Sequence, residues 1–301
     1  MKEMIKLSNV GKSYKKTEVV SIEELIIEKN SIYGLIGPNG AGKSTTMKMI
    51  CGLVDPSKGS IKVDGLEMNE KNRIPILKKI GSLIEAPSYY ANLSGYDNLD
   101  IVKDYKGFTK GDVESALDIV GLQAHKNKKV KEYSLGMKQR LGIAMALMGF
   151  PPLLILDEPT NGLDPQAMAE VRDLIRSLPK QFDTTIMISS HALDEIEKMA
   201  SQIGIIGKGR LLYQGGIKEF KARYKGQIHI RSSNNEKASL ILEDLKPKWL
   251  EESLVLPYLE DREIPKILEK LAYEGVEVYR IMDQTKSLEE LFLDFTRHEH
   301  L

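Results

Sequence analysis

Hydrophobic positions in the first two thirds of the chain alternate between short unbroken runs and longer segments with a helical pattern. Ser31–Ile36 predicts a strand that ends in a glycine-rich turn, and the apolar run Leu153–Leu156 is typical of a strand covered on both faces. Leu135–Gly149 is rich in Ala, Met and Leu, and we expect a buried helix there. Asp164-Pro165 predicts the cap and first turn of another helix, which ends near Leu178. This alternation of strands and helices predicts an α/β domain with a mixed sheet.

Smaller signals add further elements to this domain. Ser94 with Asp97, and Thr109 with Asp112, have the spacing of capping boxes, so each pair predicts a helix start. The remaining expected elements are a helix over Lys43–Cys51, strands over Ile80–Ile84 and Thr184–Ile188, and a hairpin over Ile203–Tyr213 that turns at Lys208-Gly209.

The hydrophobic pattern changes after Gly215-Gly216. Gln227–Arg280 predicts a strand, a helix, one or two strands, a helix and a strand, which together make a small βαββαβ-like unit. A capping box at Ser287–Glu290 predicts one more helix. We therefore expect an α/β domain over residues 1–215 and a small α+β accessory domain over residues 216–301.

Composition narrows the class of protein. The 301 residues include 43 Lys plus Arg and 43 Asp plus Glu, so the formal net charge is zero. This balance argues against a general nucleic-acid binder, although it leaves a local basic patch open. Cys51 is the only cysteine, which excludes an intrachain disulfide and fits a reducing compartment. The longest uncharged stretch, Leu141–Leu156, is broken by Pro151 and Pro152, whereas a spanning helix needs about 20 apolar residues. We expect neither a membrane-spanning segment nor a signal peptide.

A glycine-rich turn lies between the first of these strands and the helix that follows it. It matches the pattern G-x-x-x-x-G-K-[ST] and consists of Gly37, Pro38, Asn39, Gly40, Ala41, Gly42, Lys43 and Ser44, with Thr45 next in the helix. Backbone N–H groups and a helix N-terminus converge in such a turn, which predicts a phosphate site. Lys43 would place its charge between the β- and γ-phosphates, and the Ser44 hydroxyl would ligate Mg²⁺. The alternative is a plain glycine-rich turn between a strand and a helix.

A second motif is the acidic end of an apolar strand. Leu153–Leu156 leads directly into Asp157 and Glu158. Asp157 would lie beside the phosphate site and hold Mg²⁺, directly or through water. Glu158 would act as the general base that orients and polarises an attacking water. Taken alone, two acids at an ordinary strand end would explain the same residues, but the phosphate site favours the chemical interpretation.

Three further segments stand in a fixed order around these two motifs. They are Tyr133–Arg140 (YSLGMKQR), Asn161–Pro165 (NGLDP) and Ser189–His191 (SSH). Together with the glycine-rich turn and the acidic strand end, they resemble the signature motif, the D-loop and the histidine switch of ABC-type ATPases. The resemblance covers at least residues 1–215. It implies the P-loop NTPase fold of that family, with a mixed sheet, helices and a helical subdomain over about 86–150.

The resemblance also implies a partner protomer. In the family, residues at the positions of Ser134 and Gly136 bind the γ-phosphate of ATP held by the other protomer, and the aspartate at the position of Asp164 crosses the dimer interface. One chain therefore cannot complete a catalytic site, and a head-to-tail pair is implied. Leu135 and Met137 depart from the usual Leu-Ser-Gly-Gly-Gln form, whereas the two residues that contact phosphate are kept. Helix caps at Ser134 and Asp164 are the alternatives that need no partner.

Two more residues take roles from the resemblance. His191 would hydrogen-bond the γ-phosphate and help to position the attacking water and Glu158. Tyr14, in the segment Val10–Tyr14, matches the aromatic residue that stacks on adenine. A structural histidine after a strand, and one ordinary tyrosine among the 12 of this chain, are the alternatives.

One departure from the family concerns Glu85. The family has a glutamine here, at the end of the strand before the helical subdomain, where it touches Mg²⁺ and the attacking water. The segment Glu85–Gly95 (EAPSYYANLSG) resembles the ATPase subunits of bacitracin-export and lantibiotic-immunity transporters, in which a glutamate is usual. Ser287–Phe295 resembles the tail of ATPases that serve ABC-2-type exporters. The resemblance therefore implies that Glu85 acts at the metal and in catalysis; a solvated acid at a strand end is the alternative.

These observations imply the ATP-hydrolysing subunit of an ABC export transporter. The expected cofactors are ATP and Mg²⁺, and the expected partners are a membrane permease of the ABC-2 type and a second ATPase protomer, for which a second copy of this chain is the first choice. We expect a cytoplasmic protein, peripheral on the inner face of the cell membrane through its permease, that serves export of or immunity to a peptide antibiotic or drug.

Two other functions compete with this interpretation. A soluble ABC ATPase of nucleic-acid repair or translation is disfavoured, because the interval from Ser44 to Ser134 shows no heptads, the chain carries one cassette and its net charge is zero. No nucleic acid is therefore expected as a partner. A non-catalytic assembly factor is disfavoured because Glu158 and His191 are intact.

Overall fold

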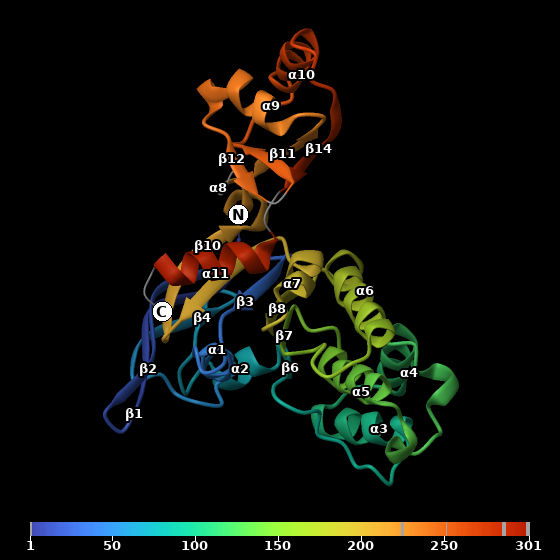
Figure 1. The fold of residues 1–301 in the computed structure, drawn as a ribbon. Coiled ribbons are helices and arrows are strands. Elements are labelled where there is room, and N and C mark those ends of the chain that lie inside the picture. The colour runs from blue at the N-terminus through green and yellow to red at the C-terminus, as the bar shows by residue number, and fades with distance from the viewer. Residues whose placement is uncertain (1, 224–225, 251, 285–286, 299–301) are drawn as a thin grey trace. The chain divides into compact units, whose positions relative to one another are not determined.

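The computed structural model describes residues 2–223, 226–250, 252–284 and 287–298. The chain divides into two compact units between Ile217 and Lys218, two residues after the change of pattern in the sequence (Figure 1). Each unit has a hydrophobic core of its own. Among the described residues, no helix has both the length and the apolar character that crossing a membrane requires.

The first unit is built on a ten-stranded mixed sheet with the order β5-β4-β1-β2-β10-β9-β3-β8-β7-β6. The strands are β1 (Glu3–Tyr14), β2 (Thr17–Glu28), β3 (Ile32–Ile36), β4 (Lys58–Val63), β5 (Leu66–Glu67), β6 (Ile80–Leu83), β7 (Leu153–Asp157), β8 (Thr185–Ser190), β9 (Gln202–Gly207) and β10 (Arg210–Gly216). From β9 through β3, β8 and β7 to β6, neighbouring strands are parallel, whereas β1, β2, β4 and β5 pair antiparallel. The mixed sheet and the predicted hairpin of β9 and β10 are confirmed.

The parallel strands end together at one edge of the sheet. Every residue of β3, β7 and β8 is buried, as their unbroken apolar runs predict. Ser189 of β8 lies opposite Leu35 on one side and opposite Asp157 on the other. The residues that follow β3, β7 and β8 therefore leave the sheet side by side, which is where ligands bind in open α/β sheets.

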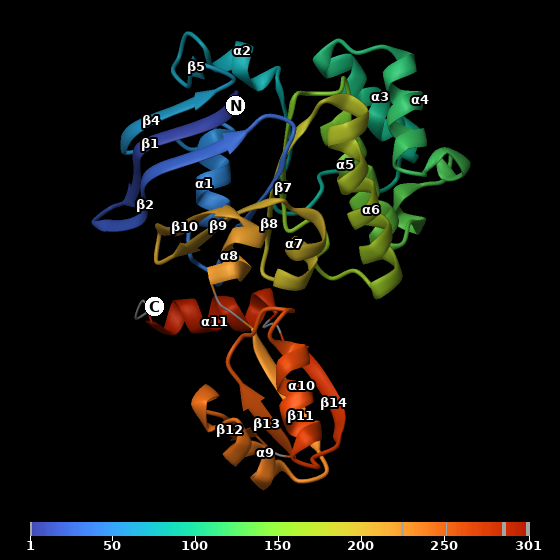
Figure 2. The same cartoon turned by 90° about the horizontal axis from the view of Figure 1, so that it is seen from above.

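The helices of the first unit are α1 (Lys43–Ile50), α2 (Arg73–Leu77), α3 (Gly95–Lys106), α4 (Lys110–Ile119), α5 (Leu135–Leu147), α6 (Pro165–Phe182) and α7 (Leu193–Met199), with two short 3₁₀ turns at Gln123–His125 and Val130–Glu132. Figures 1 and 2 both show α3, α4 and α5 gathered beside one end of the sheet. Both capping boxes are confirmed: Ser94 with Asp97 starts α3, and Thr109 with Asp112 starts α4.

Helix α6 is longer than the sequence predicts. The expected end near Leu178 is wrong, because α6 continues through Pro179 to Phe182. A proline inside a helix removes one backbone hydrogen bond. Packing compensates here, since Leu178 is fully buried and the ring of Phe182 stacks on Phe150 with centroids 4.8 Å apart.

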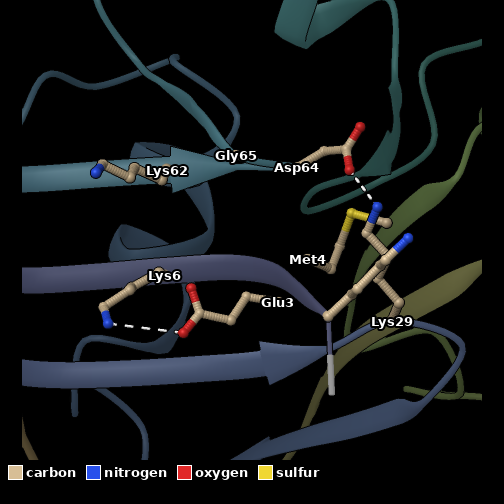
Figure 3. Close-up of a pocket in the computed structure, with 8 residues that line it drawn as sticks. Glu3, Met4, Lys6, Lys29, Lys62, Asp64 and Gly65 are labelled. Carbon is tan, nitrogen blue, oxygen red and sulfur yellow. Dashed lines mark hydrogen bonds and ion pairs between the residues drawn. The ribbon is translucent and has the colours of Figure 1, made fainter.

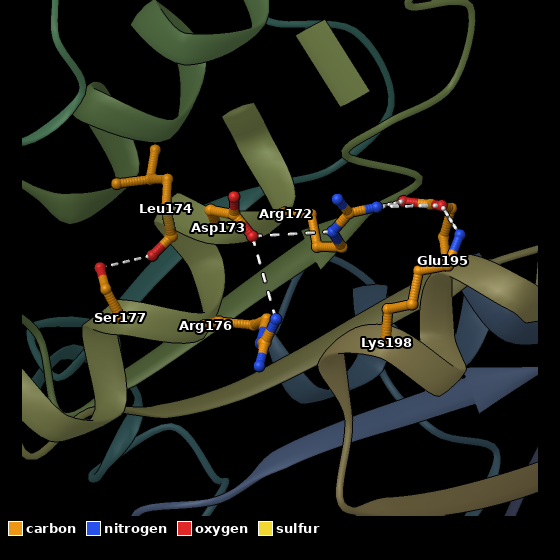
Figure 4. Close-up of polar contacts among 7 residues, drawn as sticks. All are labelled: Arg172, Asp173, Leu174, Arg176, Ser177, Glu195 and Lys198. Carbon is orange, nitrogen blue, oxygen red and sulfur yellow. Dashed lines mark hydrogen bonds and ion pairs between the residues drawn. The ribbon is translucent and has the colours of Figure 1, made fainter. Parts of the chain in front are cut away.

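A buried carboxylate ties α6 to α7 (Figure 4). Glu195 of α7 is 6% exposed. Its oxygens lie 3.4 Å from Arg172 Nη1 of α6 and 3.0 Å from Lys198 Nζ. A buried charge is stable only when it is paired and hydrogen-bonded, so this cluster favours one arrangement of the two helices. Asp164 caps α6 and His191 lies just before α7, so the cluster also restrains the segments that carry those residues.

The second unit contains most of α8 (Ile217–Arg223), then β11 (Gln227–Ser232), α9 (Asn235–Ile241), a 3₁₀ turn (Glu243–Leu245), β12 (Lys248–Leu250), β13 (Ser253–Leu256), α10 (Ile264–Tyr273), β14 (Val278–Gln284) and α11 (Leu288–His298). The four strands form an antiparallel sheet with the order β12-β13-β11-β14. From β11 to β14 the elements follow the βαββαβ order that the sequence predicts. Ser287 and Glu290 form the expected reciprocal cap at the start of α11.

Candidate functional site

The glycine-rich turn is shaped by positions that only glycine can occupy. It joins the end of β3 at Ile36 to α1, which begins at Lys43. A Cβ atom on Gly37 would lie 2.2 Å from the backbone oxygen of Ile206, so no side chain fits there. Gly40 and Gly42 have φ values of +79° and +104°, in the left-handed region that favours glycine. The backbone of the turn can therefore approach a ligand without intervening side chains.

Lys43 is a buried cation at the centre of this turn. Its side chain is 6% exposed, and Nζ donates hydrogen bonds to the backbone oxygens of Gly37 at 2.7 Å and Pro38 at 3.2 Å. Burial lowers the pKa of Lys43, and the nearby carboxylates of Glu158 and Asp157 oppose this shift. A buried ammonium whose hydrogen-bond partners are neutral carbonyls suits an anionic ligand, so the turn fits a nucleotide phosphate.

The remaining residues of the motif surround that ammonium. Pro38, Asn39 and Gly40 are exposed at the tip of the turn. Ser44 and Thr45 lie half-buried in the first turn of α1, where backbone N–H groups have no partner within the helix.

Ser189 organises the acidic end of β7, and the sequence analysis did not select it as a site residue. Asp157 is 4% exposed and accepts a hydrogen bond from the Ser189 hydroxyl. The same hydroxyl oxygen accepts a hydrogen bond from the Glu158 N–H at 3.0 Å. One buried hydroxyl therefore fixes both the candidate metal ligand and the backbone of the candidate base. The signal available beforehand was its place two residues before His191, but the pairing depends on the register of β7 and β8.

Glu158 and His191 meet although 33 residues separate them. Glu158 Oε2 lies 2.7 Å from His191 Nδ1. An ionised carboxylate can only accept hydrogen bonds, so Nδ1 carries the proton and Nε2 is left for another contact. Glu158 has a φ of +50°, and its side chain is 23% exposed against 53% for His191. The pair is therefore ordered by its own contact yet open to a bound ligand.

Among the described residues, no three Asp, Glu, His or Cys side chains gather into a ready-made metal cluster. Asp157 and Ser44 remain candidate protein ligands. Mg²⁺ in nucleotide sites is usually held by one or two carboxylates together with phosphate oxygens and water, so a full protein cage is not needed.

Glu85 forms an ion pair that the sequence analysis missed. Its Oε1 lies 2.6 Å from Nζ of Lys48, in the last turn of α1. This hydrogen bond lowers the pKa of Glu85 and raises that of Lys48. Glu85 has a φ of +64° and a side chain that is 68% exposed. The structure thus places Glu85 against the helix of the phosphate turn.

The signature and D-loop residues hold the starts of two helices. Ser134 caps α5 by accepting a hydrogen bond from Met137 N at 3.2 Å, and Asp164 caps α6 by accepting one from Ala167 N at 2.9 Å. A Cβ atom on Gly136 would lie 2.8 Å from Cβ of Ala167, so this glycine lets α5 and α6 approach. Within the described part of the chain, the hydrogen bonds of Ser134 and Asp164 stay within these helix starts.

Tyr14 lies at the end of β1 with 49% of its surface exposed. Nζ of Lys12 lies 5.1 Å from the centre of its ring. An exposed aromatic ring of this kind is free to stack on a planar ligand.

A separate polar cavity of about 450 Å³ opens where β1, β2 and β4 meet (Figure 3). Asp64 accepts hydrogen bonds there from Lys29 and from Lys79, and these bonds lower the pKa of Asp64. Glu3 lies 3.6 Å from Lys6. None of the predicted site residues lines this cavity, and its ion pairs support the strand arrangement.

Comparison with known proteins identifies the family. Residues 22–161 match the family described as ABC transporter. The chain is 40% identical, over 97% of its length and 96% of the relative, to the bacitracin transport ATP-binding protein BcrA of Enterococcus faecalis. The chain belongs to the ABC transporter ATP-binding family. This ABC ATPase is also 47% identical to the lantibiotic transport ATP-binding protein SrtF of Streptococcus pyogenes, over 75% of its own length and 97% of that relative.

Solved structures agree with the family. The ABC ATPase is similar to cbiO1 from Clostridium perfringens, part of the ABC transporter complex cbiONQ, with a TM-score of 0.68 and 25% identity over 82% of this chain and 97% of that one. It is also similar to the ATP binding subunit of an ABC transporter, with a TM-score of 0.65 and 26% identity over 73% and 93% of the two chains.

Family membership confirms several expectations from the sequence. The fold is that of the ABC ATPases, the activity is ATP hydrolysis, and the cofactors are ATP and Mg²⁺. As the ATP-binding subunit of an ABC transporter, the chain acts with a membrane permease and a second ATPase protomer. Nothing in these similarities favours a soluble ATPase of repair or translation.

Proposed function

We propose that this ABC ATPase drives export of a peptide antibiotic or drug through a separate permease of the ABC-2 type. The supporting observation is the 40% identity to a bacitracin transport ATP-binding protein, because it extends over 97% of the chain and so includes both units. The relative of lantibiotic transport supports the same class of cargo. Binding to the permease would place the chain at the inner, cytoplasmic face of the cell membrane.

The glycine-rich turn would hold the nucleotide. Lys43 donates its hydrogen bonds only to neutral backbone carbonyls, so a phosphate would supply a charged hydrogen-bond acceptor for this buried ammonium. The free N–H groups in the first turn of α1, including those of Ser44 and Thr45, would bind phosphate oxygens. Ser44 and Asp157 would hold Mg²⁺, which when bound neutralises charge on the phosphates.

Glu158 would be the base of the hydrolytic reaction. Its backbone N–H is fixed by Ser189, and its carboxylate is oriented by His191 at 2.7 Å. A base must lie within hydrogen-bond reach of the water that it activates, and orientation of that base lowers the cost of reaching the reactive geometry. The Nε2 atom of His191 remains available for the γ-phosphate. The contact between Glu158 and His191 is the observation that carries this assignment.

A second protomer would complete the site. Ser134 is exposed at the start of α5, and its cap leaves the neighbouring helix N-terminus facing solvent. Ser134 and Gly136 would bind the γ-phosphate of ATP held by the partner, and Asp164 would support the partner's site. We favour two identical protomers. The nucleotide-binding part would be residues 1–215, with its helical subdomain over about 86–150, and residues 216–301 would be an accessory domain.

Tyr14 and Glu85 would act at the two ends of the nucleotide. The exposed ring of Tyr14 would stack on adenine. Glu85 would move from Lys48 to the metal when nucleotide binds, and so would contribute to catalysis.

Replacement of Glu158 by Gln tests this function. The amide is nearly isosteric with the carboxylate but cannot act as a base, so ATP hydrolysis should fall by about 100-fold or more while ATP affinity is kept. ATP-dependent dimer formation, measured by size-exclusion chromatography, should increase. Cells expressing the chain with its permease should lose resistance to bacitracin or a lantibiotic when they carry this variant.

Glu67→Gln is a matched control, because this exposed glutamate of β5 contacts none of the site residues. The control should hydrolyse ATP as the wild type does. Hydrolysis by Glu158→Gln within a few-fold of wild type would exclude Glu158 as the base. Intact ATP hydrolysis without any effect on resistance to these peptides would instead exclude the proposed cargo class.

A further inference from the structure

Lys48 is the only residue in the described part of the chain whose side chain pairs with Glu85. The two atoms of the pair, Lys48 Nζ and Glu85 Oε1, lie 2.6 Å apart, and the side chains are 31% and 68% exposed. Lys48 belongs to α1, the helix that starts at the phosphate turn, whereas Glu85 follows β6. The ion pair therefore joins the nucleotide-binding helix to the segment that leads into α3.

The backbone at Glu85 is held in an unusual conformation. Its φ of +64° lies in the left-handed region, which is uncommon for residues other than glycine. Glu158, which follows the neighbouring parallel strand β7, has a φ of +50°. Two carboxylates thus leave adjacent parallel strands through left-handed residues. Such conformations persist where the surroundings impose them, and they are common in segments that switch.

The segment after Glu85 is anchored to the helical part of the first unit. A Cβ atom on Gly142 of α5 would lie 2.8 Å from Cβ of Pro87, so Pro87 packs directly on that helix. Asn98 of α3 is 1% exposed; its Oδ1 accepts a hydrogen bond from Tyr90 N at 2.7 Å, and its Nδ2 donates one to Tyr90 O at 3.1 Å. A displacement of Glu85 would therefore be transmitted to α3 and α5 through a short tether.

We propose that Lys48 is a positioning residue that holds Glu85 against α1 when no nucleotide is bound. Lys48 then competes with the Mg²⁺ of the nucleotide for the Glu85 carboxylate. This inference rests on the proposed function, because it takes the role at the metal that is proposed there for Glu85. Lys48 does not touch the reacting atoms. It sets how readily Glu85 leaves α1, and through Pro87 and Tyr90 it couples nucleotide binding to the helices that follow.

The exposure of the pair makes it suited to a switch. An exposed ion pair changes an equilibrium by at most about fivefold, so the metal can displace Lys48 without a large penalty. A fully buried pair would resist displacement, because separating it would leave an uncompensated charge in the interior.

The affinity for ATP with and without Mg²⁺ tests the inference. Lys48→Met also removes a positive charge near the nucleotide, which weakens ATP binding under both conditions. The informative quantity is therefore the ratio of the Kd measured in EDTA to the Kd measured in Mg²⁺. We expect this ratio to rise about three- to fivefold in Lys48→Met, because Glu85 is freed for the metal. Lys48→Arg should restore the wild-type ratio, and in a Glu85→Gln background Lys48→Met should leave the ratio unchanged.

Hydrogen exchange provides a readout without nucleotide. In the nucleotide-free protein, Lys48→Met should speed exchange of the amides of residues 85, 86, 88 and 89, since Pro87 has none. The Tyr90 amide should keep its rate, because it donates to Asn98. Lys62→Met is the matched control, because this exposed lysine of β4 has no ion-pair partner in the part of the chain that the structure describes. The control should change neither the exchange rates nor the Kd ratio.

An unchanged ratio in Lys48→Met, or an equal effect in the Glu85→Gln background, would overturn the role of Lys48. Unchanged exchange of residues 85–89 would likewise show that the ion pair does not hold the segment. Failure of the proposed function has a different signature: ATP hydrolysis would be intact, but resistance to bacitracin or a lantibiotic would not depend on the chain.

Discussion

Replacement of Ser189 by Ala should damage both the stability and the activity of this ATPase. Ser189 is fully buried in β8, and its hydroxyl makes two contacts at once. It donates a hydrogen bond to Asp157 and accepts one from the Glu158 N–H. Alanine keeps the Cβ atom and the strand, so the substitution removes these two contacts and little else.

The magnitude follows from the burial and charge of the partners. A hydrogen bond to a charged group contributes about 1.5–3 kcal/mol, and a buried N–H left without a partner costs about 1–3 kcal/mol. Both contacts are made by one hydroxyl group and their effects are not additive, so we expect the free energy of unfolding to fall by about 2–4 kcal/mol. Loss of the hydrogen bond from the Glu158 N–H to Ser189 also lets the Glu158 carboxylate move. A displacement near 1 Å at a reacting group can cost about 100-fold, so turnover should fall about 10- to 100-fold.

Urea denaturation and steady-state ATP hydrolysis measure the two effects separately. Thr184→Val, just before β8, is a matched control, because the Thr184 hydroxyl is also buried and donates to Pro151 O at 2.8 Å. It should lose about 1 kcal/mol of stability and keep its turnover. If Ser189→Ala lost stability but hydrolysed ATP as fast as Thr184→Val, the hydroxyl would support only the fold, and the link from Ser189 to the base would be wrong.

Three further outcomes are expected. Lys43→Ala should weaken ATP binding about tenfold or more, since it removes a charge-assisted hydrogen bond to phosphate; unchanged affinity by calorimetry would contradict this. Asp64→Asn should lower the free energy of unfolding at pH 7 by less than about 1 kcal/mol, because its partners Lys29 and Lys79 are partly exposed. The pKa of Asp64 is lowered in the folded chain, so its contribution is complete above about pH 4 and is lost as the pH falls further; the two denaturation curves should converge there, and a gap that widens in acid would refute the pairing. Residues 1–217 alone should bind and hydrolyse ATP, because every motif lies within them; a folded fragment that fails to bind ATP would show that the second unit is needed.

Much of the fold was accessible from local patterns. The apolar runs of β3 and β7, the capping boxes of α3 and α4 and the turn of the β9–β10 hairpin are properties of a few neighbouring residues, and all are found. The end of α6 near Leu178 was predicted wrongly, because the helix continues through Pro179, although a proline is a local signal for a helix end. The stacking of Phe182 on Phe150 outweighs that signal, and such packing is invisible in the local sequence.

The same distinction between local and long-range signals applies to the candidate site. Gly37, Lys43, Asp157, Glu158 and His191 could be selected from the sequence because their spacing is a recognisable pattern on the chain. Spacing carries no information about which side chains touch. That Glu158 meets His191 depends on β7 and β8 lying side by side in one register, with both strands ending at the same edge.

The sequence by itself therefore determined which residues are the candidates for the chemistry, and the family to which the chain belongs. Only the tertiary structure decided which other residues hold these candidates in place. Ser189 and Lys48 look like ordinary residues along the chain, and each gains its role from a partner more than 30 residues away. The physical reason is that a backbone preference arises within a few residues, whereas a hydrogen bond or an ion pair requires two groups within about 3 Å, and the order and register of the sheet bring them there.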